Sequence, residues 1–237
     1  MTQFTGSDMI TEVFDETAVG FASAIDRGVR KGRYVRGELF VSAAVDRIQP
    51  GGFILDYGCG PGRISLILAR TGFRVLALDP SPAMIAMATQ QPIDALDVEF
   101  RVCPEWPGDL PQAPYEAIVC SSVIEYVPDP EKLLRCFSAA LRPSGLLIIS
   151  FANVRSIWGA WCRMRHASTF RRAQRQMWSW PGFRRLLERG GFAPEGRPVY
   201  FESPLDRIGD LGAVVDSLGG TLGLVVARTP RTHLKLV

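Results

Sequence analysis

The chain has 237 residues, of which 47% are hydrophobic, and its formal net charge is +3. This length suits one large domain, and the nearly balanced charge argues against a protein that binds nucleic acid through a wholly basic surface. The five cysteines form no Cys-x-x-Cys pair, which is typical of free thiols in a reducing compartment. The N-terminal stretch lacks the order of a signal peptide, and no apolar run reaches the roughly 20 residues that span a bilayer. We therefore expect a cytoplasmic protein.

The first two thirds of the chain predict a helical cap followed by alternating strands and helices. Residues 1–49 form the cap, because apolar residues recur at helical spacing up to Ile48 before Pro50 and Gly51 break the pattern. In the core at 50–152 the expected strands are 53–58, 74–79, 98–103, 115–122 and 145–152. The expected helices are 62–72, 81–90 and 129–141. This alternation predicts an α/β fold with a doubly wound parallel sheet, covered by helices on both faces.

The last third departs from this alternation. Residues 153–192 are rich in Arg and Trp, and we expect them to form a helical lid insert whose last helix, 181–192, contains Gly190 and Gly191 near its end. Two more strands, 197–202 and 221–228, are expected to pair as an antiparallel hairpin within the closing segment 193–237. The sequence thus predicts a single domain, 1–237, with a seven-stranded sheet.

A glycine-rich turn follows the first expected strand, in the stretch ILDYGCGPGR that ends at Arg63. Ligands of doubly wound sheets bind beyond the carboxyl ends of the strands. Gly58 and Gly60 allow a tight turn and the close approach of a ligand. Asp79 ends the second strand, where a carboxylate can accept hydrogen bonds from both ribose hydroxyls. These residues predict a site for an adenosine-type ligand.

The spacing of the glycines separates this turn from two other nucleotide-binding loops. The dinucleotide fingerprint has its third glycine where this chain has Arg63, and the third glycine comes one residue early, at Gly62. A P-loop requires Gly-Lys-Ser/Thr, which is absent. Two plainer interpretations stay open: the glycines form only a tight strand-to-helix turn, and Asp79 only caps the next helix.

Three stretches in register resemble the class I S-adenosylmethionine-dependent methyltransferases. They are ILDYGCGPG at 54–62, VLALDPS at 75–81 and AIVCSSVIEYVPDPEKLLRCFSAALRPSGLLIIS at 117–150. The resemblance covers residues 50–150 and implies a Rossmann-like fold, an enzyme and S-adenosylmethionine as its cofactor.

The resemblance also assigns cofactor contacts. The implied set is Asp56, Gly58, Cys59, Gly60, Asp79, Pro80, Ser81, Glu105, Trp106, Cys120 and Ser121. Apart from the resemblance, we expect the N-terminal helices to close over the cofactor, where Tyr34 and Arg36 either reach the methionine carboxylate or the acceptor, or are structural helix residues. Asp79 would hold the ribose, while Cys120 and Ser121 would offer backbone groups to the methionine amine. The family often has an Asp after the third strand for the adenine amine, and this chain has Pro104 there. Glu105 is the expected substitute, and Trp106 either stacks on the base or packs as an ordinary aromatic.

The stretch CSSVIEYVPDP at 120–130 resembles the equivalent segment of the ubiquinone-pathway O-methyltransferases. Those carry acid, acid and His at the positions of Ser122, Glu125 and Tyr126, a set suited to a divalent metal, and only the acid at Glu125 is kept. We expect no metal site and take Glu125, Tyr126 and His166 as the candidate catalytic residues. Glu125 is either a base or substrate anchor, or a solvated surface residue.

Arginine and tryptophan are concentrated between residues 155 and 197, where the only acids are Glu188 and Glu195. In this fold the segment after the fifth strand commonly lies over the acceptor pocket. The pattern therefore predicts a small-molecule acceptor that is acidic, aromatic or lipid-like. Residues 156–180 could also rest on an anionic membrane surface, or their tryptophans could simply pack on the domain. We expect no nucleic-acid partner, and the sequence does not indicate the oligomeric state.

Taken together, these features predict a methyltransferase that acts on a hydroxyl oxygen of a small molecule. N-methylation of a small molecule is the nearest alternative. A non-catalytic cofactor-binding or lipid-binding protein with the same fold is the alternative from another class. The intact glycine turn and Asp79 argue against that last possibility.

Overall fold

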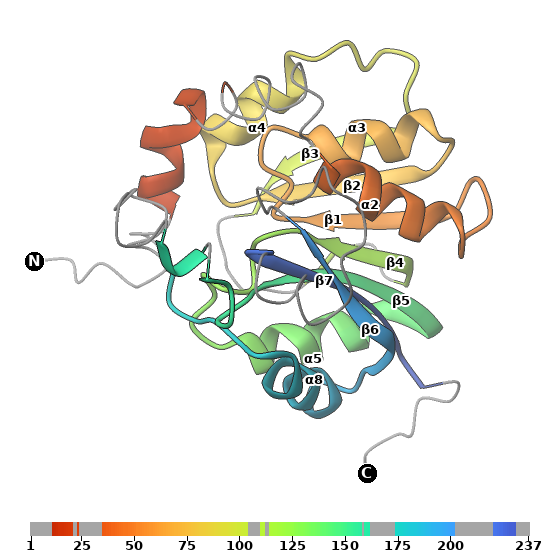
Figure 1. Ribbon diagram of the computed structural model, residues 1–237. Helices are drawn as coiled ribbons and strands as arrows, with labels where there is room; N and C mark the ends of the chain where they lie inside the picture. Colours follow the sequence, from red (N-terminus) through yellow and green to blue (C-terminus); the bar gives the residue numbers. More distant parts are fainter. Residues whose placement is uncertain are drawn as a thin grey trace, which may run out of the picture.

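The computed structural model describes residues 11–20, 23, 35–103, 110–111, 114–157, 159–161, 174–201 and 220–230. Seven strands form one sheet in the order β3-β2-β1-β4-β5-β7-β6 (Figure 1). They are β1 (Phe53–Tyr57), β2 (Arg74–Asp79), β3 (Val98–Val102), β4 (Tyr115–Cys120), β5 (Leu141–Ala152), β6 (Ala193–Phe201) and β7 (Leu222–Arg228). Neighbours from β3 to β5 pair in parallel, whereas β7 is antiparallel to both β5 and β6. The predicted Rossmann-like, mostly parallel sheet with a C-terminal antiparallel pair is confirmed.

Helices cover both faces of this sheet (Figure 1). On one face lie α2 (Val35–Val45), α3 (Arg63–Arg70) and α4 (Pro82–Thr89), and on the other lie α5 (Pro130–Ala140) and α8 (Trp180–Arg189). Adjacent residues of a strand point to opposite faces, so Ile54 packs in the core with Phe40 while Leu55 packs in the core with Phe137. Because both faces are covered, the central strands are continuous apolar runs.

Two of the predicted helix starts in the core, those of α4 and α5, are confirmed by their caps. The Ser81 hydroxyl accepts a hydrogen bond from the Met84 N–H at 3.1 Å, and the Asp129 carboxylate accepts one from the Lys132 N–H at 2.9 Å. Each cap satisfies an N–H of the first turn that has no partner within its helix. The sequence therefore sets the start of α4 and of α5 locally.

The boundaries differ from the prediction in the last third of the chain. β6 begins at Ala193 rather than at residue 197, and its register shifts between Glu195 and Val199. The expectation of a helical insert is wrong for residues 174–179, which are not helical. The Trp178 N–H donates to the Ala152 carbonyl at 2.9 Å, and the Val154 N–H donates to the Trp178 carbonyl at 3.0 Å. These bonds hold the segment as extended chain beside the end of β5.

None of the helices in the described part of the chain is both long and apolar enough to cross a membrane.

Candidate functional site

The glycine turn after β1 is tied to the acid that ends β2. The Gly60 N–H donates to Asp79 Oδ2 at 2.8 Å, and the Ser81 N–H donates to Asp79 Oδ1 at 3.0 Å. Gly58 and Gly60 have φ angles of 76° and 54°, in the left-handed region that glycine enters at little cost. The parallel pairing of β1 and β2 thus brings the turn and the carboxylate to one place at the carboxyl edge of the sheet.

Two carboxylates are buried beneath this turn. Burial raises the pKa of Asp79 to about 6, against the opposing effect of hydrogen bonds from Ser81 and Gly60. Burial also raises the pKa of Asp56 to about 7, although the Ser65 hydroxyl donates to Asp56 Oδ2 at 2.5 Å. A carboxylate oxygen has two lone-pair sites, so each Asp79 oxygen can accept a ligand hydroxyl besides its backbone partner.

Gly62 serves packing in this turn. Its φ is +77°, and a Cβ at this position would lie 2.7 Å from ring atoms of Phe100 and 3.0 Å from the Ala88 Cβ. Only a residue without a side chain lets α3 begin this close to β3 and α4. The early third glycine therefore has a structural reason, and the ligand-facing part of the turn is formed by Gly58 and Gly60.

Buried polar groups gather where β4 ends. The hydroxyl oxygens of Ser121 and Ser122 have no hydrogen-bond partner among the described residues. Ser122 has a φ of 55°, and its N–H donates to the Ser150 hydroxyl at 2.9 Å. Burial, and after it the nearby carboxylate of Glu125, raises the pKa of the Cys120 thiol well above its ordinary value. This end of β4 thus offers hydroxyl groups and a neutral thiol beside the glycine turn.

Glu125 is buried in the loop that follows. Its exposed fraction is 2%, so the interpretation as a solvated surface residue is wrong. Its backbone carbonyl accepts hydrogen bonds from the N–H groups of Arg175 and Gln176, at 2.9 and 3.1 Å. The segment after β5 therefore returns over this loop and shields it from water. Among the described residues, no three His, Cys, Asp or Glu side chains gather as metal ligands.

A helix from the N-terminal cap, residues 11–20, also reaches this edge. The Phe14 ring packs edge-on against the ring of Tyr126, with centroids 5.3 Å apart. Asp15 Oδ1 accepts hydrogen bonds from the Ser81 hydroxyl and, at 3.2 Å, from the Ala83 N–H. Phe14 and Asp15 were not predicted as site residues, because single residues in a helical stretch carry no motif.

The structure brings most of the predicted site residues together. They lie at the carboxyl ends of the adjacent strands β2, β1 and β4, or in the loops that follow, and comprise Asp56, Gly58, Cys59, Gly60, Asp79, Pro80, Ser81, Cys120, Ser121, Glu125 and Tyr126. Arg36 is half-buried in the first turn of α2, and its role stays a prediction. Tyr34, Glu105, Trp106 and His166 lie outside the described residues.

The aromatic residues near the start of α8 pack on the domain. Trp178 lies against Phe183 with ring centroids 5.4 Å apart, and Trp180 lies against Phe151 at 6.4 Å. The plainer interpretation, ordinary packing, therefore holds for both tryptophans.

Two arginines of α8 are ion-paired. Arg184 pairs with Glu188 and Arg189 pairs with Glu131, each at 2.9 Å. These two arginines are therefore partly neutralised and contribute less to a basic face than the sequence predicts.

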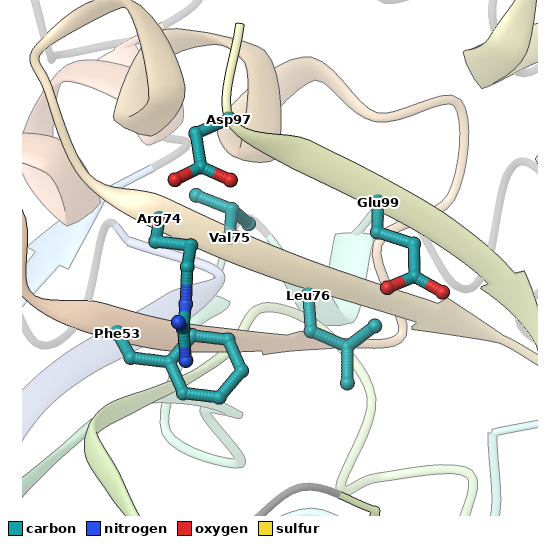
Figure 2. A pocket seen from close by; sticks show the side chains of 6 residues that line it. All are labelled: Phe53, Arg74, Val75, Leu76, Asp97 and Glu99. Atoms are coloured by element: carbon teal, nitrogen blue, oxygen red, sulfur yellow. The ribbon is translucent and has the colours of Figure 1, made fainter.

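A cavity lies at the opposite edge of the sheet (Figure 2). It is lined by Phe53, Arg74, Val75, Leu76, Asp97 and Glu99. The Arg74 guanidinium lies 3.8 Å from the centroid of the Phe53 ring, a cation–π contact. These residues precede or begin β1, β2 and β3, so the cavity is at the amino ends of the strands and is separate from the candidate site.

Comparison with known proteins agrees with this geometry. Residues 30–195 match the family model described as a methyltransferase domain. The ubiquinone biosynthesis O-methyltransferase of Xanthomonas campestris pv. campestris (strain B100) is 33% identical over 111 residues, which cover 44% of each protein. That of Xylella fastidiosa (strain 9a5c) is 35% identical over 106 residues, which cover 44% of this chain and 43% of the relative. The match thus spans less than half the length of these curated relatives.

Solved structures show the same fold over most of the chain. Magnesium protoporphyrin IX methyltransferase from Synechocystis PCC 6803, with bound SAH, has a TM-score of 0.70 at 17% identity, covering 93% of this chain and 98% of that one. The putative methyltransferase complexed with the Haloferax volcanii Trm112 activator has a TM-score of 0.65 at 21% identity, covering 92% and 97%. Because the family model spans well over half of the sequence and the sheet, turn and acid agree with it, the chain belongs to the methyltransferase domain family, as a class I S-adenosylmethionine-dependent methyltransferase.

Proposed function

We propose that this protein transfers the methyl group of S-adenosylmethionine to a hydroxyl oxygen of a small molecule. The observation that carries the proposal is the burial of Glu125 in the loop after β4, next to the strand that bears the glycine turn. A carboxylate at this place can take a proton from an acceptor. The curated relatives named O-methyltransferases support the choice of oxygen over the part of the chain that they match.

The chain's own groups fit the cofactor. Asp79 would accept hydrogen bonds from the ribose hydroxyls, since its two oxygens are held in place by the Gly60 and Ser81 N–H groups. Gly58 and Gly60 leave the turn open to a close ligand. The Ser121 hydroxyl, which has no partner among the described residues, would meet the methionine end. When bound, the cofactor supplies a methyl group already activated by its sulfonium.

Glu125 would act on the acceptor. It would take the proton of the acceptor hydroxyl as that oxygen receives the methyl group that the cofactor would supply. General base catalysis of this kind contributes about 10²–10⁴-fold to the rate. The backbone of Arg175 and Gln176, which covers the loop, would keep water away from the reacting groups.

The acceptor is proposed to carry an apolar part. Val154, Ile157 and Trp161 follow β5 closely and are exposed by 49%, 65% and 37%. Apolar side chains that are partly exposed at this edge favour a lipid-like or aromatic acceptor, or contact with an anionic membrane surface that bears one. Acceptors for screening should therefore include phenols with short and long alkyl chains, offered in buffer and in vesicles with and without anionic lipid. Equal rates for all of them would contradict this part of the proposal.

Binding and turnover together test the proposed function. Calorimetric titration of S-adenosylmethionine should show binding to the wild type and to Glu125→Gln, but at least tenfold weaker binding to Asp79→Asn, which loses a charged acceptor. Asp97→Asn, an exposed acid before β3, is the matched control and should bind like the wild type. No binding to the wild type would contradict the proposal.

The Glu125→Gln variant distinguishes the two kinds of acceptor. With a hydroxyl acceptor its kcat should fall about 10²–10⁴-fold, because the base is lost. With an amine acceptor the loss should appear mainly in KM, since the carboxylate would then serve to bind a cation. The second result would favour N-methylation, the reaction named for a structural neighbour from Thermotoga maritima, a possible histamine N-methyltransferase.

A further inference from the structure

The strand β3 forms one side edge of the sheet. Among the described strands its only neighbour is β2, so its other side faces away from the sheet. The strand at the opposite side edge, β6, is interrupted by Pro194, Pro198 and a shift in register, features that hinder pairing with a further strand. β3 has the sequence Val-Glu-Phe-Arg-Val and contains neither proline nor glycine. It is therefore the side of the sheet that can accept another strand.

Two hydrogen bonds to β2 fix the orientation of the β3 backbone. The Val75 N–H donates to the Asp97 carbonyl at 2.9 Å, and the Cys103 N–H donates to the Asp79 carbonyl at 3.0 Å. Asp97 and Cys103, which flank β3, therefore turn backbone groups toward β2. In a parallel ladder the backbone groups of successive residues point to alternate sides. The odd-numbered residues of β3 thus face β2, and the even-numbered residues face away from it.

The outward-facing residues of β3 are Val98, Phe100 and Val102. A second β3 strand that lay antiparallel and centred on Phe100 would meet them with its own outward-facing residues. Val98 would then oppose Val102 of the second copy, and Phe100 would oppose its own counterpart. In each of these pairs the two residues exchange both hydrogen bonds. Val102, whose side chain is 37% exposed, would be covered by Val98 of the second copy.

The charged residues of β3 fit the same arrangement. Glu99 and Arg101 form an ion pair within the strand, and their side chains are 54% and 41% exposed. In the centred register Glu99 lies directly opposite Arg101 of the second copy, in the type of pair that brings side chains closest together. A shift by two residues in either direction would set Glu99 against Glu99, or Arg101 against Arg101. The charges therefore favour one register.

We propose that a second copy of this chain pairs with β3, antiparallel and centred on Phe100, so that two sheets join into one. The strand is self-complementary, as a two-fold symmetric dimer requires, because the charges on either side of Phe100 have opposite sign. Antiparallel pairing puts the carboxyl edge of one sheet beside the amino edge of the other, so the two candidate sites lie at opposite edges of the joined sheet. A contact of one short strand per chain is small, and the dimer should be weak and reversible.

Sedimentation velocity of the full chain, from about 1 µM to about 500 µM, measures this dimer. The wild type should form it reversibly as the concentration rises. Glu99→Arg and Arg101→Glu each set like charges opposite one another in both symmetric pairs, and each should weaken dimerisation about tenfold. The double variant Glu99→Arg/Arg101→Glu restores opposite charges with their signs exchanged. Its dimerisation should return to within about threefold of that of the wild type.

A matched control makes the same substitution elsewhere. Glu188 on α8 is exposed and paired with Arg184, and Glu188→Arg should dimerise like the wild type. Circular dichroism checks that each variant is folded. A wild type that stays monomeric over the whole range would overturn the proposal. A double variant as weak as the single variants, or an equal loss in Glu188→Arg, would overturn it as well.

Amide hydrogen exchange, followed by NMR in the wild type alone, tests the register. In the dimer the N–H groups of Val98, Phe100 and Val102 bond to the second copy, so their exchange should slow as the protein concentration rises. The N–H groups of Glu99 and Arg101 face β2 in the monomer and in the dimer, and their exchange should not change. A dimer that forms without slowing exchange at the three even-numbered residues would use another surface, which would overturn the proposal.

Discussion

Asp56 and Asp79 stand at the ends of two neighbouring strands, and both are held by the chain before any ligand arrives. Asp56 receives the Ser65 hydroxyl from α3, and Asp79 receives the N–H groups of Gly60 and Ser81. Burial raises both pKa values, to about 7 and about 6. The charged forms are therefore less stable in the folded chain than in water. The protein keeps these two acids at some cost to its stability, as is common for groups that serve a site.

Asp56 should make stability fall as pH rises. In the unfolded chain its pKa is 3.8, and in the folded chain it is about 7, so the folded state binds more protons between these values. The free energy of unfolding should decrease as pH rises from about 4 to about 7. Asp56→Asn keeps an acceptor for Ser65 but cannot ionise. Between pH 5 and pH 8 the free energy of unfolding of this variant should fall by about 2–3 kcal/mol less than that of the wild type.

Urea denaturation at pH 5 and pH 8 measures this difference. Asp97→Asn alters an exposed acid and should follow the wild type at both values. Asp79 is present in all three proteins, and its charge adds to the raised pKa of Asp56, so this interaction is part of the expected difference. Parallel pH profiles for the wild type and Asp56→Asn would show that burial of Asp56 does not govern this dependence.

At the scale of elements, the site depends on how closely α3 begins beside the sheet. Gly62 is the N-cap of α3, and it faces the Phe100 ring of β3 and Ala88 of α4 at distances that exclude a side chain. The turn before it, with Gly58 and Gly60, is placed by this packing. A change at Gly62 therefore acts on the site through the position of a whole helix.

Gly62→Ala should destabilise the fold by about 2–4 kcal/mol, the sum of strain at positive φ and of overpacking against Phe100. Gly72→Ala is the matched control, because Gly72 also has a positive φ, of +92°, but a Cβ there would come no closer than 3.9 Å to Pro50. Gly72→Ala should lower the free energy of unfolding by about 1–2 kcal/mol, from backbone strain alone. Urea denaturation of both variants separates the two contributions. Equal losses of stability in the two variants would mean that the Phe100 ring moves aside at no energetic cost.

At the scale of the whole molecule, the last strand completes both cores. β7 lies between β5 and β6, although it is the last of the described strands in the sequence. Val225 and Ala227 belong to the core beneath α5 and α8, and Leu224 and Val226 belong to the core beneath α2 and α3. Without β7, one edge of β5 has no hydrogen-bonded neighbour and each core lacks part of its apolar residues.

A truncated chain of residues 1–192, which lacks β6 and β7, should not form a folded monomer. It would leave the backbone of β5 unpaired along one side and expose apolar residues on both faces, a combination that promotes aggregation. Size-exclusion chromatography and circular dichroism compare it with the full chain. A soluble monomer with the spectrum of the full protein would show that the first five strands form an independent unit.

Local pattern predicted most of the fold, for reasons that the structure makes plain. Strands such as β1 and β4 are short apolar runs bounded by glycine or proline, and α4 and α5 carry their own capping residues. β6 was predicted to begin too late, at residue 197, because a glycine such as Gly196 is typical of a turn, whereas the strand passes through this position with a shift in register. Extended chain at residues 174–179 was missed because it is held by hydrogen bonds to Ala152 and Val154, not by a periodic pattern.

The sequence by itself determined the sheet of alternating elements, the glycine turn, the acid at Asp79 and the family, because these depend on spacing between near neighbours. Only the tertiary structure decided that Glu125 is buried, that Gly62 packs against Phe100, and that Asp15 meets Ser81 across 66 positions of the chain. Contacts between residues so far apart in the sequence depend on how the sheet and its helices pack together. The spacing of residues within one segment does not predict which distant segment will pack over it.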